Sequence, residues 1–436
     1  MSELFLYFIW QYQDFDHTDL RTTDGEPIQI IHPGFRNNHA GPDFTNARLL
    51  INDVEWVGTV EIHVNTADWL AHKHQQDRAY DNVILHLVWH DDRPATGKRI
   101  DRADGSPLPT LDLEHRTDYA LLERAAALTD APDSIPCAGS FRNVQPLRVT
   151  SMLDKVLLQR LERKAADVKI IFDQTGQDWE ETTYRLLAQN MGFKINAQPM
   201  LQLAGALPLK VIRKHRDAPA QIEALIFGMA GMLNDPSTGE LEFPDDYRIP
   251  LRREYQFLAA KYGLTGSQLS PHIWKWGRLR PANFPTMRLA QFAQLLNEQP
   301  SLLSLFVGEN SAADLIRALQ VKPSAYWQTH YRFGKKAAKA SSTLGETSAE
   351  NIIVNTIVPL LAAYAKHRDQ PAFLDRAVTL LEQLPPEKNR ITDDWNALGL
   401  TVKTAFDAQA SIELYNHFCL NKRCLQCQIG VAIVKQ

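Results

Sequence analysis

Residues 40–64 read AGPDFTNARLLINDVEWVGTVEIHV, and this stretch decides the fold of the amino-terminal part of the chain. Two strand-like runs, residues 47–51 and 54–64, flank Asn52-Asp53, a dipeptide that favours a tight β-hairpin turn. Antiparallel pairing of the runs brings Asp43 and Glu61 to the same end of the sheet. Because strand side chains alternate, His63 points to the same face as Glu61. The stretch thus predicts a cluster of Asp, Glu and His side chains.

Two carboxylates that lie side by side in a cleft repel each other unless a cation sits between them. Oxygen ligands of this kind suit Mg²⁺ or Mn²⁺. We therefore expect Asp43 and Glu61 to bind one of these ions. The structural alternative is that Asp43 merely closes a turn after Gly41-Pro42, and that Glu61 pairs with Arg48 across the hairpin.

The pattern Pro42-Asp43, a gap, and Glu61-Ile62-His63 resembles the PD-(D/E)XK nuclease superfamily, with His63 where that superfamily most often has Lys. The resemblance covers residues 1–95. The expected order of elements is αβββαβ, the core topology of the superfamily, and its helices and strands are residues 3–13, 27–32, 47–51, 54–64, 66–80 and 82–90. The whole chain also resembles a bacterial family catalogued as a domain of unknown function.

The resemblance implies roles for the clustered residues. Asp43 and Glu61, with the backbone carbonyl of Ile62, would hold the metal ion. The ion would lower the pKa of a bound water and offset charge on a phosphate oxygen. His63 replaces a lysine cation, so a neutral His63 would act as a general base or a third ligand.

Further residues are candidates for the same site. His39, four residues before Asp43, is a candidate metal ligand, and His32 and Glu3 are candidates to join the site as a ligand and an accessory acid. Gln76 and Tyr80 lie four apart on the helix expected over residues 66–80, so both could face the cleft as catalytic residues. The alternative for each is an ordinary surface or strand residue.

The predicted fold class is α+β. At 436 residues the chain is too long for one compact core. We predict a nuclease-like domain over residues 1–131, a linker over 132–146 that contains several prolines, and a mostly helical domain over 147–436. Apolar residues recur at helical spacing throughout that last region.

The charge is unevenly distributed. The chain carries a net charge of −4, which combines −11 for residues 1–145 with +7 for residues 146–436. A basic part joined to an acidic, metal-binding part favours a polyanionic partner, and we expect nucleic acid, DNA more than RNA. An acidic surface that simply maintains solubility is the alternative. No apolar run approaches a membrane span, and no basic-then-apolar leader is present, so we expect a cytoplasmic protein without membrane contact.

The segment WKWGRLRPANFPTMR, residues 274–288, mixes aromatic and basic side chains. Aromatic rings stack on bases and guanidinium groups bind phosphates. We therefore expect Lys275, Arg278, Arg280 and Arg288 to contact nucleic acid. The alternative is an ordered loop in which the arginines cap helices.

Three of the four cysteines, Cys419, Cys424 and Cys427, lie in one C-x4-C-x2-C cluster, and Cys137 is the fourth. A C-x2-C pair suits a tetrahedral metal site, so the four thiolates are expected to bind Zn²⁺. A 4Fe–4S cluster is the other candidate, by resemblance to nuclease families with one early and three late cysteines. The alternative is a set of reduced thiols without metal.

The function that follows is metal-dependent hydrolysis of phosphodiester bonds in nucleic acid. The alternative is a non-catalytic nucleic-acid-binding or scaffold protein on a degenerate nuclease fold that has lost the lysine. A metal-dependent hydrolase of small phosphoesters is a third reading. The sequence leaves the oligomeric state open.

Overall fold

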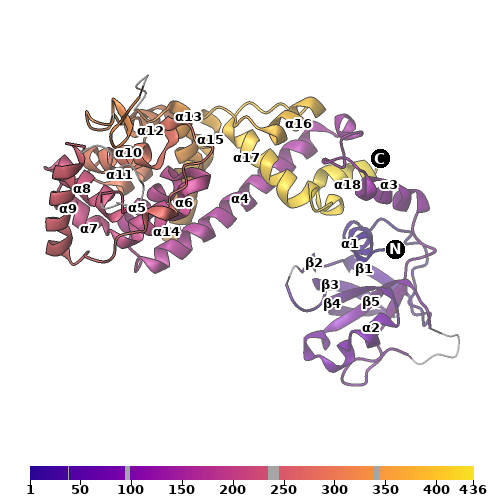
Figure 1. The fold of residues 1–436 in the computed structure, drawn as a ribbon. Helices are drawn as coiled ribbons and strands as arrows, with labels where there is room; N and C mark the ends of the chain where they lie inside the picture. Colours follow the sequence, from indigo (N-terminus) through magenta and orange to yellow (C-terminus); the bar gives the residue numbers. More distant parts are fainter. Residues whose placement is uncertain (38, 94–98, 234–244, 338–342) are drawn as a thin grey trace. The chain divides into compact units, whose positions relative to one another are not determined.

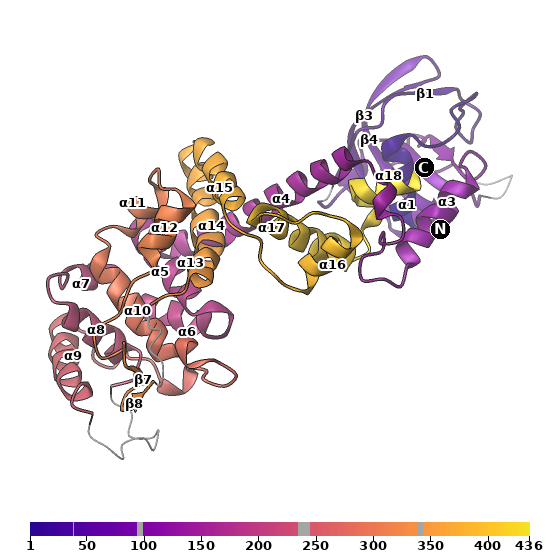
Figure 2. The same cartoon turned by 90° about the horizontal axis from the view of Figure 1, so that it is seen from above.

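The computed structural model describes residues 1–37, 39–93, 99–233, 245–337 and 343–436. The chain divides into two compact units, drawn in Figures 1 and 2. Unit 1 comprises Met1–Asp154 and Glu413–Gln436, and unit 2 comprises Lys155–Ile412. The predicted linker at 132–146 therefore lies inside unit 1, and residues 413–436 belong with the amino-terminal unit rather than with the helical one.

Unit 1 is built on a mixed sheet with the order β1-β3-β4-β5-β6, to which β2 adds beside β3. The β1–β3 and β3–β4 pairs are antiparallel, and β5 and β6 add in parallel to β4. The strands are β1 (Ile28–His32), β2 (Phe35–Arg36), β3 (Phe44–Ile51), β4 (Val54–Asn65), β5 (Val83–His90) and β6 (Thr110–Asp112). The α+β fold class is confirmed.

The predicted hairpin joins β3 to β4. Asn52 and Asp53 both take a positive φ, 49° and 65°, as a tight turn of this kind requires. Ile51 pairs with Val54 next to the turn, and Phe44 pairs with Val60 at the far end. The hairpin therefore places the start of β3 beside the middle of β4, and residue 43 close to residue 61.

The two faces of β4 are covered by different elements. Helix α1 (Glu3–Tyr12) packs on one face through an apolar stripe, and the Tyr7 ring contacts Phe44, the partner of Val60 in the sheet. The opposite face carries Glu61 and His63, and there the segment after β4 packs (Figure 1). Side-chain alternation along β4 thus separates an apolar face from a polar one.

The helix expected over residues 66–80 is wrong as one continuous element. The segment forms a short helix, α2 (Asp68–Ala71), and two single turns, η1 (His74–Gln76) and η2 (Arg78–Tyr80). Lys73 takes a left-handed conformation with φ 62°, and Asp77 is extended. These residues end the helix and fold the chain back over β4.

In the rest of unit 1, the tail of the chain packs against α3 (Tyr119–Asp130). The tail contains η8 (Cys424–Gln426) and α18 (Gln428–Val434), which pack on α3, α1 and η3 (Phe141–Asn143). Arg124 donates a hydrogen bond of 2.8 Å to the carbonyl of Val434. A side chain at Gly430 would clash with the Cys424 carbonyl, 2.2 Å from the added Cβ, so glycine permits this close packing.

Unit 2 is helical, as predicted, with a small antiparallel pair β7 (His330–Arg332) and β8 (Lys335–Lys336). Helix α4 (Pro146–Gln174) starts in unit 1 and ends in unit 2. The other helices are α5 (Trp179–Met191), α6 (Phe193–Ala206), α7 (Leu209–Arg213), α8 (Pro219–Met229), α9 (Arg248–Tyr262), α10 (Pro285–Glu298), α11 (Leu302–Val307), α12 (Ala312–Leu319), α13 (Glu346–Ile352), α14 (Val358–Arg368), α15 (Ala372–Gln383), α16 (Arg390–Leu398) and α17 (Ala405–Leu414).

The continuous helical segment Glu346–Arg368 is long and apolar enough to cross a membrane by length and composition. Two-thirds of its most apolar window, 67%, is buried inside the protein. Its apolar side chains, among them Ile352, Leu360 and Leu361, are fully covered by neighbouring helices. Burial on this scale is typical of a core helix in a helical domain.

Gly58 in β4 tests the packing of the hairpin. A Cβ at this position would lie 2.5 Å from Ile84 Cγ2 and 2.6 Å from the Asn82 carbonyl. We expect Gly58→Ala to lower the free energy of unfolding of unit 1 by about 1–3 kcal/mol, because backbone cannot move aside as a side chain does. Gly139→Ala is the matched control, since nothing lies within 4 Å of its added Cβ. Equal unfolding midpoints for both variants in urea would contradict the packing described.

Candidate metal centre

Asp43 and Glu61 are joined by reciprocal hydrogen bonds. Glu61 Oε2 accepts from the Asp43 backbone N–H at 3.2 Å, and Asp43 Oδ2 accepts from the Ile62 backbone N–H at 3.0 Å. Each carboxylate is therefore fixed by the strand that carries the other. The prediction that the hairpin brings these two acids together is confirmed.

Both carboxyl groups are held in a setting that disfavours their charge. Burial, opposed in part by the Ile62 hydrogen bond, raises the pKa of Asp43 from 3.8 to about 6. Burial and the negative charge of Asp43 raise the pKa of Glu61 from 4.5 to about 9. A cation between the two groups would reverse both effects, because it stabilises the charged forms.

Two histidines lie close to the outer oxygen of Glu61, and a third lies beside them. His74 Nε2 lies 3.3 Å from Glu61 Oε1, and His63 Nε2 lies 3.7 Å from the same atom. His63 Nε2 is also 3.1 Å from His72 Nδ1. One ligand nitrogen from each of His63, His72 and His74 lies within 4.8 Å of the other two. The arrangement suits a metal ion with Glu61 as a fourth ligand.

Burial favours the neutral, metal-binding form of His63 and His74. Burial, with the charges of His74 and His72, lowers the pKa of His63 from 6.5 to about 3. Burial and His72 also lower the pKa of His74. Nδ1 of His63 lies 2.8 Å from Nε2 of the fully buried His86. A metal on His63 Nε2 would leave the ring proton on Nδ1, and the Nδ1–H group would donate a hydrogen bond to His86. Hydrogen bonds of this kind commonly orient the histidine ligands of a metal.

Aromatic side chains hold the histidines in place. The rings of His74 and Tyr80 lie 3.8 Å apart, and Trp69, which is fully buried, contacts both His74 and His86. Tyr80 therefore lies beside the histidine cluster, although not on the continuous helix that was expected to carry it. Burial, with the charges of Glu61 and Asp43, raises the pKa of its hydroxyl to about 12, so Tyr80 stays protonated at neutral pH.

Helix α1 supplies the other wall of the carboxylate pair. The Tyr7 hydroxyl donates to Glu3 Oε2 at 3.4 Å and also bonds the Asp43 carboxyl. The charge of Glu3 raises the pKa of both Asp43 and Glu61, although less than burial does. The Arg36 guanidinium lies over the Tyr7 ring, 4.6 Å from its centroid. Glu3 therefore lies beside the site, as expected for an accessory acid.

Other sequence candidates lie elsewhere. His39 is exposed, and its backbone N–H bonds the Asn37 side chain, so the prediction that it is a ligand is not supported by its position. His32 Nδ1 accepts from the Gly34 N–H, and its ring packs on Phe35. Gln76 is exposed at the end of η1, because the expected helix that would have aligned it with Tyr80 is broken.

His72, His74 and His86 were not predicted as site residues from the sequence. The available signal was the segment His72-Lys73-His74, which follows soon after the strand that carries Glu61 and His63. His86 in the next strand was a further signal. Placed on a continuous helix, His72 and His74 point in different directions. The left-handed Lys73 turns both imidazoles to the same side.

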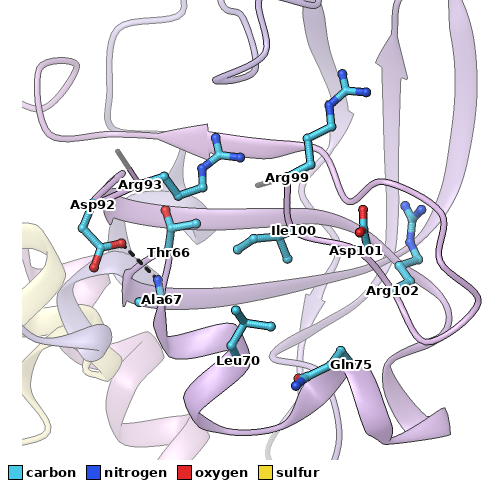
Figure 3. A pocket seen from close by; sticks show the side chains of 10 residues that line it. All are labelled: Thr66, Ala67, Leu70, Gln75, Asp92, Arg93, Arg99, Ile100, Asp101 and Arg102. Atoms are coloured by element: carbon cyan, nitrogen blue, oxygen red, sulfur yellow. Dashed lines mark hydrogen bonds between the residues drawn. The ribbon is translucent and has the colours of Figure 1, made fainter. Parts of the chain in front are cut away.

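A separate pocket of about 410 Å³ lies beside α2 (Figure 3). Arg93, Arg99 and Arg102 line it, but each is engaged: Arg93 with Asp91, Arg99 with Asp24, and Arg102 with the Val83 carbonyl. Asp92 and Asp101 also line it, which offsets the positive charge.

The basic segment of unit 2 only partly fits the predicted nucleic-acid contact. Lys275, Arg278 and Arg280 are exposed. Arg288 is buried, with 6% of its surface exposed; it bonds Gln291 and Asn283 and lies 4.4 Å over the Phe193 ring. The prediction that Arg288 contacts nucleic acid is therefore wrong, because its guanidinium is buried and hydrogen-bonded near the start of α10.

The four cysteines all lie in unit 1 and are all buried. Burial first, and then the charges of Cys427 and Cys424, raise the pKa of Cys137 to about 12. Burial and the charge of Cys427 raise the pKa of Cys424 to about 11. Cys137 therefore folds against the tail, as the sequence analysis expected.

The ligand types at the Glu61 site narrow the choice of ion. Carboxylate oxygens suit Mg²⁺ and Mn²⁺, whereas imidazole nitrogens suit Zn²⁺, Fe²⁺ and other later transition metals. Asp43 and Glu61 form the oxygen side, and the three histidines form the nitrogen side. Glu61 contributes one oxygen to each side. The residues thus fit Mn²⁺ or Zn²⁺ better than an ion bound by oxygen alone.

The fold and this cluster define the class as an α+β protein with a buried histidine–carboxylate centre at one end of a mixed sheet. The family comparison is more specific. Residues 3–390 match the family described as a protein of unknown function, DUF2851, and the chain belongs to that family. Neither the curated proteins nor the solved structures include a significant match, and these comparisons give no indication of a nuclease superfamily.

Removing metal makes the stability of the protein depend on pH through Glu61. Its pKa is about 9 in the fold and 4.5 ordinarily, so between these values the folded state holds more protons and stability falls as pH rises. His63, His74 and His86, whose pKa values are lowered, act in the opposite sense only below about pH 6.5. From pH 6.5 to about 8 we expect Glu61 to contribute a loss of up to about 1.4 kcal/mol per pH unit.

Thermal unfolding in chelator across this range is the measurement. Glu61→Gln, which is neutral at every pH, should remove this part of the slope. A slope equal to that of the unaltered chain would show that Glu61 is already ionised in the metal-free fold.

Metal binding itself is tested by titration calorimetry with Mn²⁺ and with Zn²⁺. We expect His74→Ala and Glu61→Gln each to weaken binding at least 10-fold, because each removes a ligand from a preformed site. His39→Ala is the matched control and should bind as the unaltered protein does, since His39 is exposed away from the cluster. Weakened binding in His39→Ala, with normal binding in His74→Ala, would contradict the site.

Proposed function

We propose that this protein is a metal-dependent phosphodiesterase that acts on nucleic acid, with its reaction centre at Asp43, Glu61 and the histidine cluster. The observation that carries the proposal is the reciprocally bonded, buried acid pair beside a cluster of three histidines. Buried carboxyls with raised pKa values are common at functional sites.

The arrangement of elements supports a nuclease among metal-dependent hydrolases. Apart from the two-residue strand β2 and the single turns η1 and η2, the elements α1, β1, β3, β4, α2 and β5 have the order αβββαβ, and the acid pair lies on the β3–β4 hairpin. This order and the position of Asp43 and Glu61-Ile62-His63 are those expected from the resemblance to PD-(D/E)XK nucleases. A similar fold does not by itself show a shared function, so the proposal rests on the residues of the reaction centre.

A bound metal ion would supply an activated water and a positive charge near the phosphate. Asp43 and Glu61 hold the oxygen side of such an ion, and His63, His72 and His74 hold the nitrogen side. Tyr80, protonated at neutral pH, is placed beside Glu61 to donate a hydrogen bond to a phosphate oxygen. Trp69 and α1 keep water away from the buried side of the cluster.

His63 takes a different role from the lysine of the nuclease pattern. Its pKa of about 3 makes it neutral, so it cannot offset phosphate charge as a lysine cation does. With Nδ1 toward His86, its Nε2 is directed at Glu61 and His72. We therefore assign His63 to metal binding rather than to charge neutralisation, and a transition metal provides the missing positive charge.

Charge distribution supports a polyanionic substrate. Residues 1–145 carry −11 and residues 146–436 carry +7, and Lys275, Arg278 and Arg280 are exposed in the basic part. A basic unit attached to a metal centre would retain nucleic acid while the centre acts on it. DNA is the first substrate to test, with RNA beside it.

The deciding experiment incubates the purified full chain with labelled single-stranded DNA, duplex DNA and RNA, with Mn²⁺, Mg²⁺, Zn²⁺ or chelator. We expect cleavage with Mn²⁺, loss in chelator, and a fall of at least 100-fold in Glu61→Gln and in His63→Ala, because both remove metal ligands. His39→Ala should cut at the normal rate.

Two results oppose the proposal in different ways. Cleavage that survives Glu61→Gln would place the reaction elsewhere or in a contaminant. Salt-dependent binding of nucleic acid without cleavage under any metal would favour the non-catalytic binding protein.

A further inference from the structure

The strongest unassigned feature of the molecule is the set of four cysteines in unit 1. Cys137 lies in a turn before α4, and Cys419, Cys424 and Cys427 lie in the tail, almost three hundred residues later. Each is buried, with 7–8% of its surface exposed. They account for all the cysteines of the chain, and the fold gathers every one of them in one place.

The four sulfurs share one neighbourhood. Cys137 senses the charges of Cys424 and Cys427, and Cys419 senses those of all the other three. Cys424 and Cys427 also act on each other. Every pair among the four is therefore close enough to interact, and none of the four is joined in a disulfide.

The backbone around the sulfurs is shaped by tight turns. The Cys419 carbonyl accepts from the Lys422 N–H, and the Cys424 carbonyl accepts from the Cys427 N–H at 3.1 Å. The Cys137 carbonyl accepts from the Ser140 N–H in the same way. Turns of this kind place successive thiols of a C-x2-C pair on one side, as metal-binding knuckles require.

From this geometry we infer that Cys137, Cys419, Cys424 and Cys427 together bind an iron–sulfur cluster as four thiolates. The inference does not rest on the proposed function. Burial disfavours the charged thiolate form of Cys137, Cys419 and Cys424, and a bound metal centre would stabilise that form. Binding releases the four thiol protons.

The spacing of the sulfurs distinguishes a cluster from a single zinc ion. Four thiolates around zinc, each about 2.3 Å from the ion, stand about 3.8 Å from one another. Among the described residues, three ligand atoms within 4.8 Å of one another occur at the histidine cluster and not at the cysteines. No three of the sulfurs are thus as close together as thiolates around one zinc ion, which favours a centre of several metal atoms.

The centre would also fix the tail to the rest of unit 1. Lys422 Nζ donates to the Ala131 carbonyl at 3.0 Å, and Lys435 pairs with Asp14 at 2.8 Å, just beyond α1. Turn η8, which begins at Cys424, packs on α1. Helix α1 in turn carries Glu3 and Tyr7 beside the Asp43 carboxylate. A filled cysteine centre therefore supports the wall of the histidine–carboxylate site.

The test is purification of the full chain without oxygen from iron-supplied cells, followed by assay of iron, acid-labile sulfide and zinc per chain, and by absorbance near 400 nm. We expect about four irons and about four sulfides per chain, as for a [4Fe–4S] centre. Cys427→Ser and Cys137→Ser should each lose most of the sulfide and the absorbance. Ser140→Ala, in the same turn as Cys137, should retain both.

Glu61→Gln separates the two metal sites, because it should lose Mn²⁺ binding but keep the sulfide and the absorbance. If the cysteine variants fail to fold, the unaltered protein stripped of metal and then given iron and sulfide replaces them, and it should regain the absorbance. One zinc per chain without sulfide overturns the cluster. Absence of metal and sulfide both after anaerobic purification and after reconstitution overturns the centre.

Discussion

The reciprocal pair of hydrogen bonds between Asp43 and Glu61 is the constraint on which the rest of unit 1 depends. Each carboxylate accepts from a backbone N–H on the other strand, so neither can move without breaking the end of the hairpin. Both are buried, and burial raises both pKa values. The protein thus holds two acids where water solvates them poorly, and a cation bound between them would stabilise their charged forms.

The sequence predicted the hairpin because its determinants are local. Asn52 and Asp53 tolerate positive φ, and alternating apolar residues on either side set the register, which together fix the separation of Asp43 from Glu61. The α+β class and the helices of unit 2 followed from periodicity in the same way. Where a short range of residues decides an element, composition and spacing were sufficient.

Features that depend on a single backbone conformation or on distant packing were not predictable. Residues 66–80 have a helical composition, yet Lys73 is left-handed, and this conformation brings His72 and His74 to Glu61. Lysine carries no signal for it. Arg288 illustrates the other limit. The sequence around it is the same whether its side chain lies on the surface or, as here, is only 6% exposed and packs on Phe193.

Unit 1 is discontinuous in the chain, since residues 413–436 return to it after the whole of unit 2. During synthesis the ribosome therefore releases every residue of the helical unit before the last segment of the unit that holds the sheet. Until the tail is translated, the part of unit 1 that is made first lacks α18 and three of the four thiols. The order of synthesis and the order of completion are thus reversed, and chaperone protection of the nascent chain would be needed longest at its amino-terminal end.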